Sequence, residues 1–281
     1  MKKYAIITMD VEDWYHTYFP EADIDRSISL LDGLDVALDI MKKDDIHGSF
    51  FVVGEIADML ANKLREMDKE GHDIAVHNCQ HLRPVTMTPD EFRSQLLEAK
   101  QKIEGILGHE VQGYRAPSFG IDDERLDIVR GCGFKYDSSK LKPQKSAKYG
   151  VLNLKGFKET LPCIHQNKGF TEFEVSTEKI GDMNMLLGGG YIRMLPWFFI
   201  KHMTQKYLDS GKPYVMYIHP IDLSPKPMPK VDGISFDRYL RTHIGRRHMV
   251  WRFKKVIEML KKSGYEFVTF EELLRIYPTG E

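Results

Sequence analysis

Apolar runs of strand length alternate with segments of helical periodicity through the first half of the sequence. The first run, residues 4–9, is followed by residues 29–43, in which leucines recur at helical spacing. The pattern continues with predicted strands at 48–53, 72–76, 111–114 and 134–137, and predicted helices at 55–70, 89–107 and 122–131. Because strands joined by helices pair in parallel, this alternation predicts an α/β fold built on a parallel sheet or barrel.

The alternation stops near residue 140 and returns near residue 214. The intervening stretch contains several lysines, Pro and Gly residues, one expected strand at 173–175 and the run Gly188–Gly190, interpreted as a turn. Further elements are predicted as helices at 196–208, 247–262 and 271–276 and strands at 214–218 and 267–270. Since no repeat or linker divides the chain, we expect a single domain over residues 1–281 with an irregular insertion around residues 140–190.

The composition of the chain excludes some classes of binding partner. The 281 residues carry 40 Lys and Arg against 41 Asp and Glu, so no bulk field attracts nucleic acid, and no nucleic-acid partner is expected. The apolar runs are too short for a transmembrane segment, and the first one is too short for a signal peptide. Three scattered cysteines fit a reducing compartment. These features predict a cytoplasmic protein, or one peripheral to the inner membrane.

Polar, titratable side chains cluster just after five of the predicted strands. They are Asp10, Glu12 and Asp13 after the first strand, His77 and His81 after the third, then Arg115, Asp137 and His219. The carboxyl ends of parallel strands gather at one face of an α/β fold. The sequence therefore predicts that these groups meet in space.

The spacing of His77 and His81 allows both imidazoles to reach one metal ion if the segment is helical or tightly turned. One carboxylate from the Asp10–Asp13 segment would complete a two-His, one-carboxylate site for Zn²⁺ or another first-row divalent metal. Chance spacing among eleven histidines and an acidic turn that starts a helix are the alternatives. Cys79 is interpreted as a small buried hydrophobe rather than a soft ligand.

The remaining groups suit acid–base chemistry around such a metal. A second carboxylate, held near the cation but not on it, would take a proton from water, and Arg115 would hold that carboxylate ionised. His219 would act as an acid on the opposite side of the substrate. Asp137 is expected to orient His219.

Five motifs stand in one order along the chain. They are Thr8–Trp14, Gly71–His81, Gly113–Gly120, Tyr136–Ser139 and Tyr217–Pro220. This set resembles the polysaccharide deacetylases of carbohydrate esterase family 4, the NodB-homology proteins, over about residues 4–275. The segments Gly188–Pro196 and His219–Asp222 most resemble the subgroup encoded with exosortase-linked exopolysaccharide systems.

The resemblance implies a distorted (β/α)7 barrel, single-domain and NodB-like, that hydrolyses the N-acetyl group of an N-acetylhexosamine. It also implies a divalent metal, usually zinc, with Co²⁺, Mn²⁺, Ni²⁺ or Fe²⁺ as alternatives. Matched by position, Asp10 would be the base, His77 and His81 metal ligands, Arg115 the arginine that orients the base, Asp137 the aspartate that tunes the acid, and His219 the acid. The family commonly has two adjacent acids, whereas here Asp10 precedes Val11, so either Glu12 or Asp13 is the expected carboxylate ligand.

The expected partner is an N-acetylated glycan, as a polymer, an oligosaccharide or a lipid-linked precursor, and the oligomeric state is left open. Aromatic residues after the acids would form either a sugar-stacking wall or plain core: Trp14, Tyr15, Tyr18 and Phe19. Two other functions remain in play. One is a non-catalytic glycan-binding or scaffold component of exopolysaccharide biosynthesis. The other uses the metal site for hydrolysis of a small cyclic amide or for iron-dependent oxygen chemistry.

Overall fold

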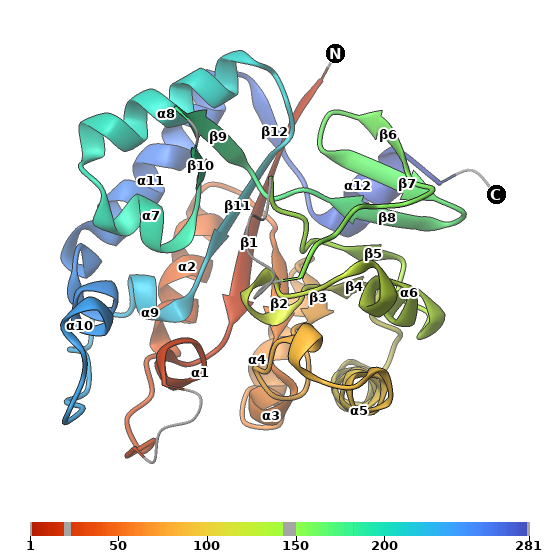
Figure 1. Ribbon diagram of the computed structural model, residues 1–281. Coiled ribbons are helices and arrows are strands. Elements are labelled where there is room, and N and C mark those ends of the chain that lie inside the picture. The colour runs from red at the N-terminus through yellow and green to blue at the C-terminus, as the bar shows by residue number, and fades with distance from the viewer. Residues whose placement is uncertain (1, 20–23, 143–149, 182, 280–281) are drawn as a thin grey trace.

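Seven parallel strands curl into an open barrel at the centre of the molecule (Figure 1). The computed structural model describes residues 2–19, 24–142, 150–181 and 183–279. In spatial order the seven strands are β11 (Tyr214–Ile218), β1 (Lys3–Val11), β2 (Ser49–Val52), β3 (Asp73–Val76), β4 (Gly113–Tyr114), β5 (Tyr136–Asp137) and β8 (Phe170–Phe173). An eighth parallel strand, β12 (Tyr265–Phe267), pairs with β1. The predicted α/β fold, a distorted (β/α)7 barrel, is confirmed.

The barrel is joined across its open edge by the segment that follows β8. The backbone N–H of Ser176 donates to the carbonyl of Val215 at 3.2 Å, and the Ser176 hydroxyl accepts from the N–H of Val215 at 2.8 Å. These two bonds connect the chain after β8 to β11. The ends of β8 and β11, the two outermost parallel strands, are therefore held together around one central cavity.

Helices pack around the outside of the barrel (Figure 1). Their bounds are α1 Trp14–Tyr18, α2 Asp32–Lys43, α3 Gly54–Ala57, α4 Ala61–Lys69, α5 Pro89–Leu107, α6 Asp123–Gly131, α7 Gly189–Met194, α8 Trp197–Asp209, α9 Pro220–Leu223, α10 Phe236–His243, α11 Arg246–Lys262 and α12 Phe270–Ile276. Short 3₁₀ turns span Pro84–Thr86 and Pro117–Phe119. In the part of the chain that the structure describes, no helix is both long and apolar enough to cross a bilayer.

Helix α5 begins and ends where the sequence predicts. Thr88 and Glu91 form a reciprocal capping box at its start, and Pro89 occupies the first turn, where its missing N–H costs nothing. The helix ends at Gly108, whose φ of +83° is a left-handed conformation that glycine adopts without steric cost. A cap of this kind contributes about 1 kcal/mol to stability.

Two predicted elements differ from the structure at their ends. The helix expected at 55–70 is divided into α3 and α4, because the start of α3 is tied by hydrogen bonds from Gly54 and Glu55 to the carbonyls of residues 78 and 79. The strand expected at 267–270 ends at Phe267. Thr269 instead caps α12 in a box with Glu272, and this cap draws Phe270 into the helix.

The region around residues 140–190 is more regular than expected. It contains an antiparallel ladder of β6 (Lys158–Leu161), β7 (Ile164–Asn167) and β8, and a separate hairpin of β9 (Thr177–Ile180) and β10 (Met183–Leu186). The strand predicted at 173–175 shares only its first residue with β8. Of the lysines noted in this region, Lys145 and Lys148 lie outside the described residues.

The glycine run is not a free turn. Gly188 precedes α7, and the next two glycines form its first turn. A Cβ at Gly188 would lie 2.5 Å from the Tyr217 ring, and one at Gly189 would lie 2.6 Å from it. Glycine is therefore required here because α7 approaches β11 directly over Tyr217.

Candidate functional site

The predicted site residues lie at the carboxyl end of the barrel. Asp10 is near the end of β1, and the loops after β1, β3, β4 and β11 contribute the others. The structure brings six of the eight predicted residues together: Asp10, Glu12, His77, His81, Arg115 and His219. Asp13 and Asp137 have other partners.

Glu12, His77 and His81 form a group that could hold a cation. One ligand atom from each lies within 4.8 Å of the others. Oε2 of Glu12 is 2.5 Å from Nε2 of His81 and 4.0 Å from Nε2 of His77. Thr17 donates to Oε1, whereas Oε2 has no hydrogen-bond partner among the described residues. A buried, unpaired carboxylate oxygen between two imidazoles fits a divalent first-row metal.

The protonation states in this group also suit a cation. Burial alone would raise the pKa of Glu12, but the charges of His81 and His219 hold that pKa well below its usual range. Burial lowers the pKa of His77 to about 4 despite the nearby acids. Nδ1 of His77 lies 2.8 Å from the carbonyl oxygen of Arg115. A neutral ring therefore donates from Nδ1 and leaves Nε2 as a lone pair facing Glu12.

Asp13 caps a helix instead of facing the histidines. Its Oδ1 accepts from the backbone N–H of Trp14 at 2.8 Å and from that of Leu30 at 2.9 Å. The Asp13 N–H donates to Nδ1 of His16, which completes a capping box at α1. Of the two candidate carboxylates, only Glu12 belongs to the group with both histidines. Cys79 is buried, and burial raises the pKa of its thiol to about 11, in line with a small hydrophobic role.

Asp10 is held by a fully buried arginine. Nη1 of Arg115 donates to Oδ1 of Asp10 at 2.7 Å and to the Thr8 hydroxyl at 2.8 Å. Nε and Nη2 donate to the carbonyl and hydroxyl of Ser138, and the guanidinium lies 4.0 Å above the Phe51 ring. This charge-assisted contact fixes the orientation of the Asp10 carboxyl group. Its other oxygen, Oδ2, lies 3.9 Å from Nε2 of His219.

His219 is oriented by Asp222, not by Asp137 as expected. Oδ2 of Asp222 accepts from the His219 backbone N–H at 3.1 Å and lies 3.2 Å from its Nδ1. Oδ1 of Asp222 accepts from Nε of the fully buried Arg193 at 2.8 Å. With Nδ1 engaged, Nε2 faces Asp10 and Glu12.

These neighbours decide the charge of the His219 ring. Burial alone would lower the pKa of His219, but the hydrogen bond to Asp222 and the charges of Glu12 and Asp10 raise it to about 9. Burial likewise opposes an ionised Asp222, yet His219 and Arg193 lower the pKa of its carboxyl. His219 is therefore a cation at neutral pH, with a proton on the nitrogen that faces the cavity.

Asp137 fastens two loops instead. It accepts from the N–H of Ser139 at 3.0 Å and from its hydroxyl at 2.8 Å, and that hydroxyl in turn accepts from the N–H of Ala116. Within the described chain, no hydrogen bond or ion pair joins Asp137 to His219. Burial raises the pKa of Asp137 to about 6 and that of its neighbour Glu172 well above the usual value. The expected contact with His219 is wrong because the two groups belong to different clusters.

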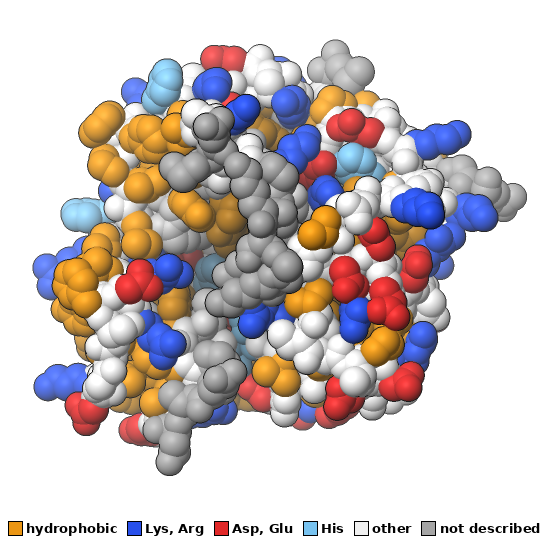
Figure 2. Space-filling model, viewed as in Figure 1, with side chains coloured by type: hydrophobic (Ala, Val, Ile, Leu, Met, Phe, Trp, Pro, Cys, Tyr) orange, Lys and Arg blue, Asp and Glu red, His pale blue; other side chains and the backbone are white. Residues whose placement is uncertain are grey.

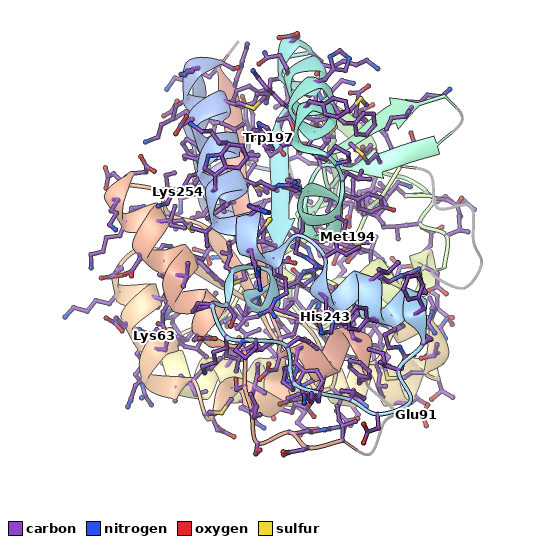
Figure 3. All side chains as sticks on the ribbon, turned by 90° about the vertical axis from the view of Figure 1, so that its left-hand side faces the viewer. Lys63, Glu91, Met194, Trp197, His243 and Lys254 are labelled. Atoms are coloured by element: carbon purple, nitrogen blue, oxygen red, sulfur yellow. The ribbon has the colours of Figure 1, made fainter. Side chains whose placement is uncertain are left out.

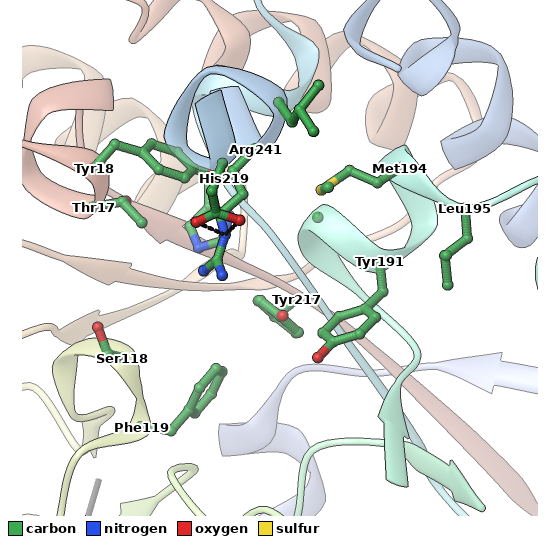
Figure 4. Close-up of a pocket in the computed structure, with 13 residues that line it drawn as sticks. Thr17, Tyr18, Ser118, Phe119, Tyr191, Met194, Leu195, Tyr217, His219 and Arg241 are labelled. Atoms are coloured by element: carbon green, nitrogen blue, oxygen red, sulfur yellow. Dashed lines mark hydrogen bonds and ion pairs between the residues drawn. The ribbon is translucent and has the colours of Figure 1, made fainter. Parts of the chain in front are cut away.

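A cavity of about 510 Å³ opens beside His219 (Figure 4). Its aromatic lining comes from four separate segments: Tyr18, Phe119, Tyr191 and Tyr217. The aromatic residues that follow the acids therefore do not share one role: some line the cavity and others form core. Tyr18 lines the cavity, whereas Trp14 and Phe19 are buried with ring centroids 5.5 Å apart, as part of a small core cluster.

The sequence contains a local signal for Asp222, although the resemblance of this segment indicates only the subgroup. His219 and Asp222 form a reciprocal capping box across Pro220, at the start of α9. Acids at this position usually serve the helix alone. Here the same carboxylate also reaches the imidazole, and Arg193 could not have been paired with it by spacing, since 29 residues separate them.

Comparison with known proteins identifies the two halves of the chain. Residues 31–136 match the family model described as polysaccharide deacetylase, and residues 139–275 match a domain of unknown function, DUF3473. The peptidoglycan deacetylase of Helicobacter pylori is 25% identical over 287 residues, covering 96% of this chain and 93% of that protein. An uncharacterized 30.6 kDa protein of Geobacillus stearothermophilus is 33% identical over 125 residues, but the match covers 42% of this chain and 47% of that protein.

Solved structures share the fold. A candidate polysaccharide deacetylase from Mycobacterium smegmatis aligns with a TM-score of 0.64 at 19% identity, covering 98% of this chain and 90% of that one. A family 4 acetyl xylan esterase from Clostridium thermocellum aligns with a TM-score of 0.54 at 17% identity, covering 99% and 93%. Together with the five motifs, these matches show that the chain belongs to the polysaccharide deacetylases of carbohydrate esterase family 4, a family of hydrolases with NodB homology.

Proposed function

We propose that this protein is a metal-dependent N-deacetylase. Its substrate would be N-acetylhexosamine units of a polysaccharide, or of an oligosaccharide or lipid-linked precursor. One observation carries the proposal. Asp10 and His219 flank the Glu12–His77–His81 group, and each is held by a buried arginine, directly or through Asp222.

Glu12, His77 and His81 would hold a divalent metal, which when bound supplies a Lewis acid for the amide carbonyl and for water. Zn²⁺ suits one carboxylate and two imidazoles with open positions. The C. thermocellum esterase named above was solved with cobalt, so Co²⁺ is included in the test.

Asp10 would act as general base. Because Arg115 occupies its Oδ1, the free Oδ2 accepts the proton of the attacking water as the oxygen adds to the acetamide carbon. Arg115 also holds Thr8 and Ser138, so Asp10 need not reorganise during the step. This fixed geometry lowers the entropic cost of the attack.

His219 would act as general acid. Its Nε2 proton passes to the sugar nitrogen as the C–N bond breaks, which gives acetate and a free amino sugar. Asp222 stabilises the charged ring and holds Nε2 toward the cavity, and Arg193 holds Asp222 in place. The cavity lined by Tyr18, Phe119 and Tyr191 offers apolar faces for a pyranose ring.

The glycan itself is inferred only by class. Several relatives are named as peptidoglycan deacetylases, among them the H. pylori protein. The resemblance of the Gly188–Pro196 and His219–Asp222 segments to exosortase-linked proteins favours an exopolysaccharide. Arg193 lies in the first of these segments and Asp222 in the second, and the two residues form the pair behind His219.

The test is acetate release from N-acetylated chito-oligosaccharides by purified protein, first stripped with a chelator and then supplied with Zn²⁺, Co²⁺ or Mn²⁺. We expect release to stop with the metal and to return with it. His77→Ala should bind no metal and release no acetate. His109, an exposed histidine just after the end of α5, is the control, and His109→Ala should match wild type.

The outcomes separate the alternatives. Bound metal without acetate from chitin, peptidoglycan or exopolysaccharide fragments would favour a non-catalytic glycan-binding role. The loss of catalysis has a precedent in the fold, because a carbohydrate esterase family 4 pseudoenzyme from Bacillus anthracis aligns with a TM-score of 0.54 at 14% identity. Release that persists after the metal is removed would contradict the proposal.

A further inference from the structure

Helices α7, α8, α10 and α11 form one face of the molecule, here called the helical face, that exposes large apolar side chains. Phe198 on α8 is 76% exposed and Trp251 on α11 is 47% exposed. Trp197 packs against Trp251 with ring centroids 5.0 Å apart, so the two helices share an aromatic cluster. Figure 2 shows hydrophobic atoms along this edge of the molecule, and Figure 3 views the face directly, with Trp197 between α8 and α11.

The same four helices are strongly basic. Their sequences contain twelve Lys and Arg but only three acids, Asp209, Asp237 and Glu258. The whole chain has a net charge of −1, so the remaining residues carry the compensating excess of acids. Positive charge is therefore concentrated on the side of the molecule that also exposes its aromatic residues.

Cations flank the exposed aromatic side chains at helical spacing. Lys201 follows Phe198 by one turn of α8, while Arg247 and Lys254 lie one turn before and after Trp251 on α11. All three cations are exposed, and no ion pair is recorded for them within the described ranges of the chain. They are free to meet an external anion.

The helical face reaches the mouth of the catalytic cavity. Tyr191 and Met194 of α7 are 44% and 36% exposed and also line the cavity beside His219. Arg241 of α10 lines the opposite wall. A surface that docked against the helical face would thus lie at the entrance to the cavity.

We propose that the helical face docks on a bilayer containing anionic phospholipids. Exposed Trp and Phe side chains surrounded by Lys and Arg match the headgroup region, where aromatic rings enter the interface and cations meet phosphate. A purely apolar face would suit another protein equally well, but the exposed cations Lys201, Arg247 and Lys254 beside the aromatic side chains favour an anionic surface. This inference goes beyond the proposed function, since docking requires no turnover.

The test is co-sedimentation of the full chain with vesicles. We expect binding to vesicles of phosphatidylglycerol and phosphatidylcholine in equal parts, weak binding to phosphatidylcholine alone, and loss of binding in high salt. Lys201→Glu with Lys254→Glu should weaken binding about tenfold or more. Phe198→Ser should weaken it by a comparable factor, about tenfold.

Matched controls lie on other parts of the surface. Met59, 63% exposed between α3 and α4, gives Met59→Ser, and Lys155, exposed before β6, gives Lys155→Glu. Both should bind as wild type does, and all variants should keep wild-type acetate release from a soluble oligosaccharide. Equal binding by the Lys201→Glu/Lys254→Glu protein and wild type would overturn the proposal. So would a dimer in sedimentation velocity that Phe198→Ser abolishes, without vesicle binding, since a second copy would then cover the face.

Discussion

The two ends of the barrel both bury carboxyl groups, but with opposite partners. At the carboxyl end, Asp10 meets the Arg115 guanidinium and Glu12 meets three histidines. At the amino end, Asp73 is 4% exposed and meets neutral donors, accepting from the hydroxyls of Ser49 and Tyr136 at 2.7 Å each and from the backbone of Glu271. The same residue type is thus provided with cationic neighbours at one end and neutral ones at the other.

This difference sets the charge of each group. Burial disfavours any ionised carboxyl, and a nearby positive charge can reverse that preference. Glu12 has such charges and its pKa falls, whereas burial and the nearby Glu271 together raise the pKa of Asp73 to about 7. The ionised Glu12 at the carboxyl end can bind a cation. The acid at the amino end holds its proton to higher pH and serves the packing of β2, β3 and β5.

The largest expected effect comes from removing the charge of Glu12. Glu12→Gln should bind little metal and reduce acetate release to background, because the amide is a poor cation ligand. Asp13→Asn, one residue away, should keep its metal, most activity and its stability, because Asn caps a helix about as well as Asp does. Metal analysis and thermal unfolding of the two proteins decide this. Metal loss in Asp13→Asn with retention in Glu12→Gln would reverse the assignment.

Removing the base should come next in size. Asp10→Asn is expected to keep the metal and lower kcat by about 10²- to 10⁴-fold, the usual contribution of a general base. The measurement is kcat together with metal content. A variant that loses its metal would make Asp10 a ligand, and one with unchanged kcat would remove it from the proposed mechanism.

A smaller effect is expected at the residue behind the acid. Asp222→Asn removes the charge that stabilises the His219 cation, so kcat should fall about 10- to 100-fold with little change in KM, since the group does not face the cavity. The alkaline limb of the pH–rate profile should also move to lower pH, because the pKa of His219 falls when its anionic partner is lost.

Asp137→Asn is the matched control for Asp222→Asn. Asp137 has no contact with His219 among the described residues, so its substitution should leave that alkaline limb where it is in wild type. A shift of the limb in Asp137→Asn but not in Asp222→Asn would restore the pairing that the sequence suggested.

The same comparison explains what could be predicted from sequence. Parallel strands place their carboxyl ends together, so the meeting of Asp10, His77 and Arg115 follows from the order of elements alone. The start of α5 is equally local, since Thr88, Pro89 and Glu91 define it within four residues. Predictions succeed where the cause lies within one element or in the rule that joins parallel strands.

The predictions that failed concern segments with a weak sequence pattern or contacts between residues far apart in the sequence. β6 is an exposed edge strand and β7, beside it, has mostly polar, half-buried side chains, so both lack the apolar alternation that reveals a strand. Their turns use Cys163 and Lys168 at positive φ, without a consistent turn signal. The Arg193–Asp222 contact depends on how α7 packs on β11, which no spacing in the sequence encodes.

The smallest expected effect is on the pH dependence of stability at the amino end. The pKa of Asp73 is raised from 3.8 to about 7 in the folded protein, so between these values the unfolded chain releases a proton that the folded chain keeps. Stability should therefore fall as pH rises through this window. Above the window, the contribution of Asp73 to stability should no longer change with pH. Urea titrations should show that the free energy of unfolding falls less for Asp73→Asn than for wild type between pH 5 and pH 8. The difference should be about 1–2 kcal/mol. Exposed Asp39→Asn should follow wild type. Identical pH profiles for wild type and Asp73→Asn would mean that Asp73 is ionised in the folded state, and neutral hydrogen-bond donors would then suffice to hold a buried charge.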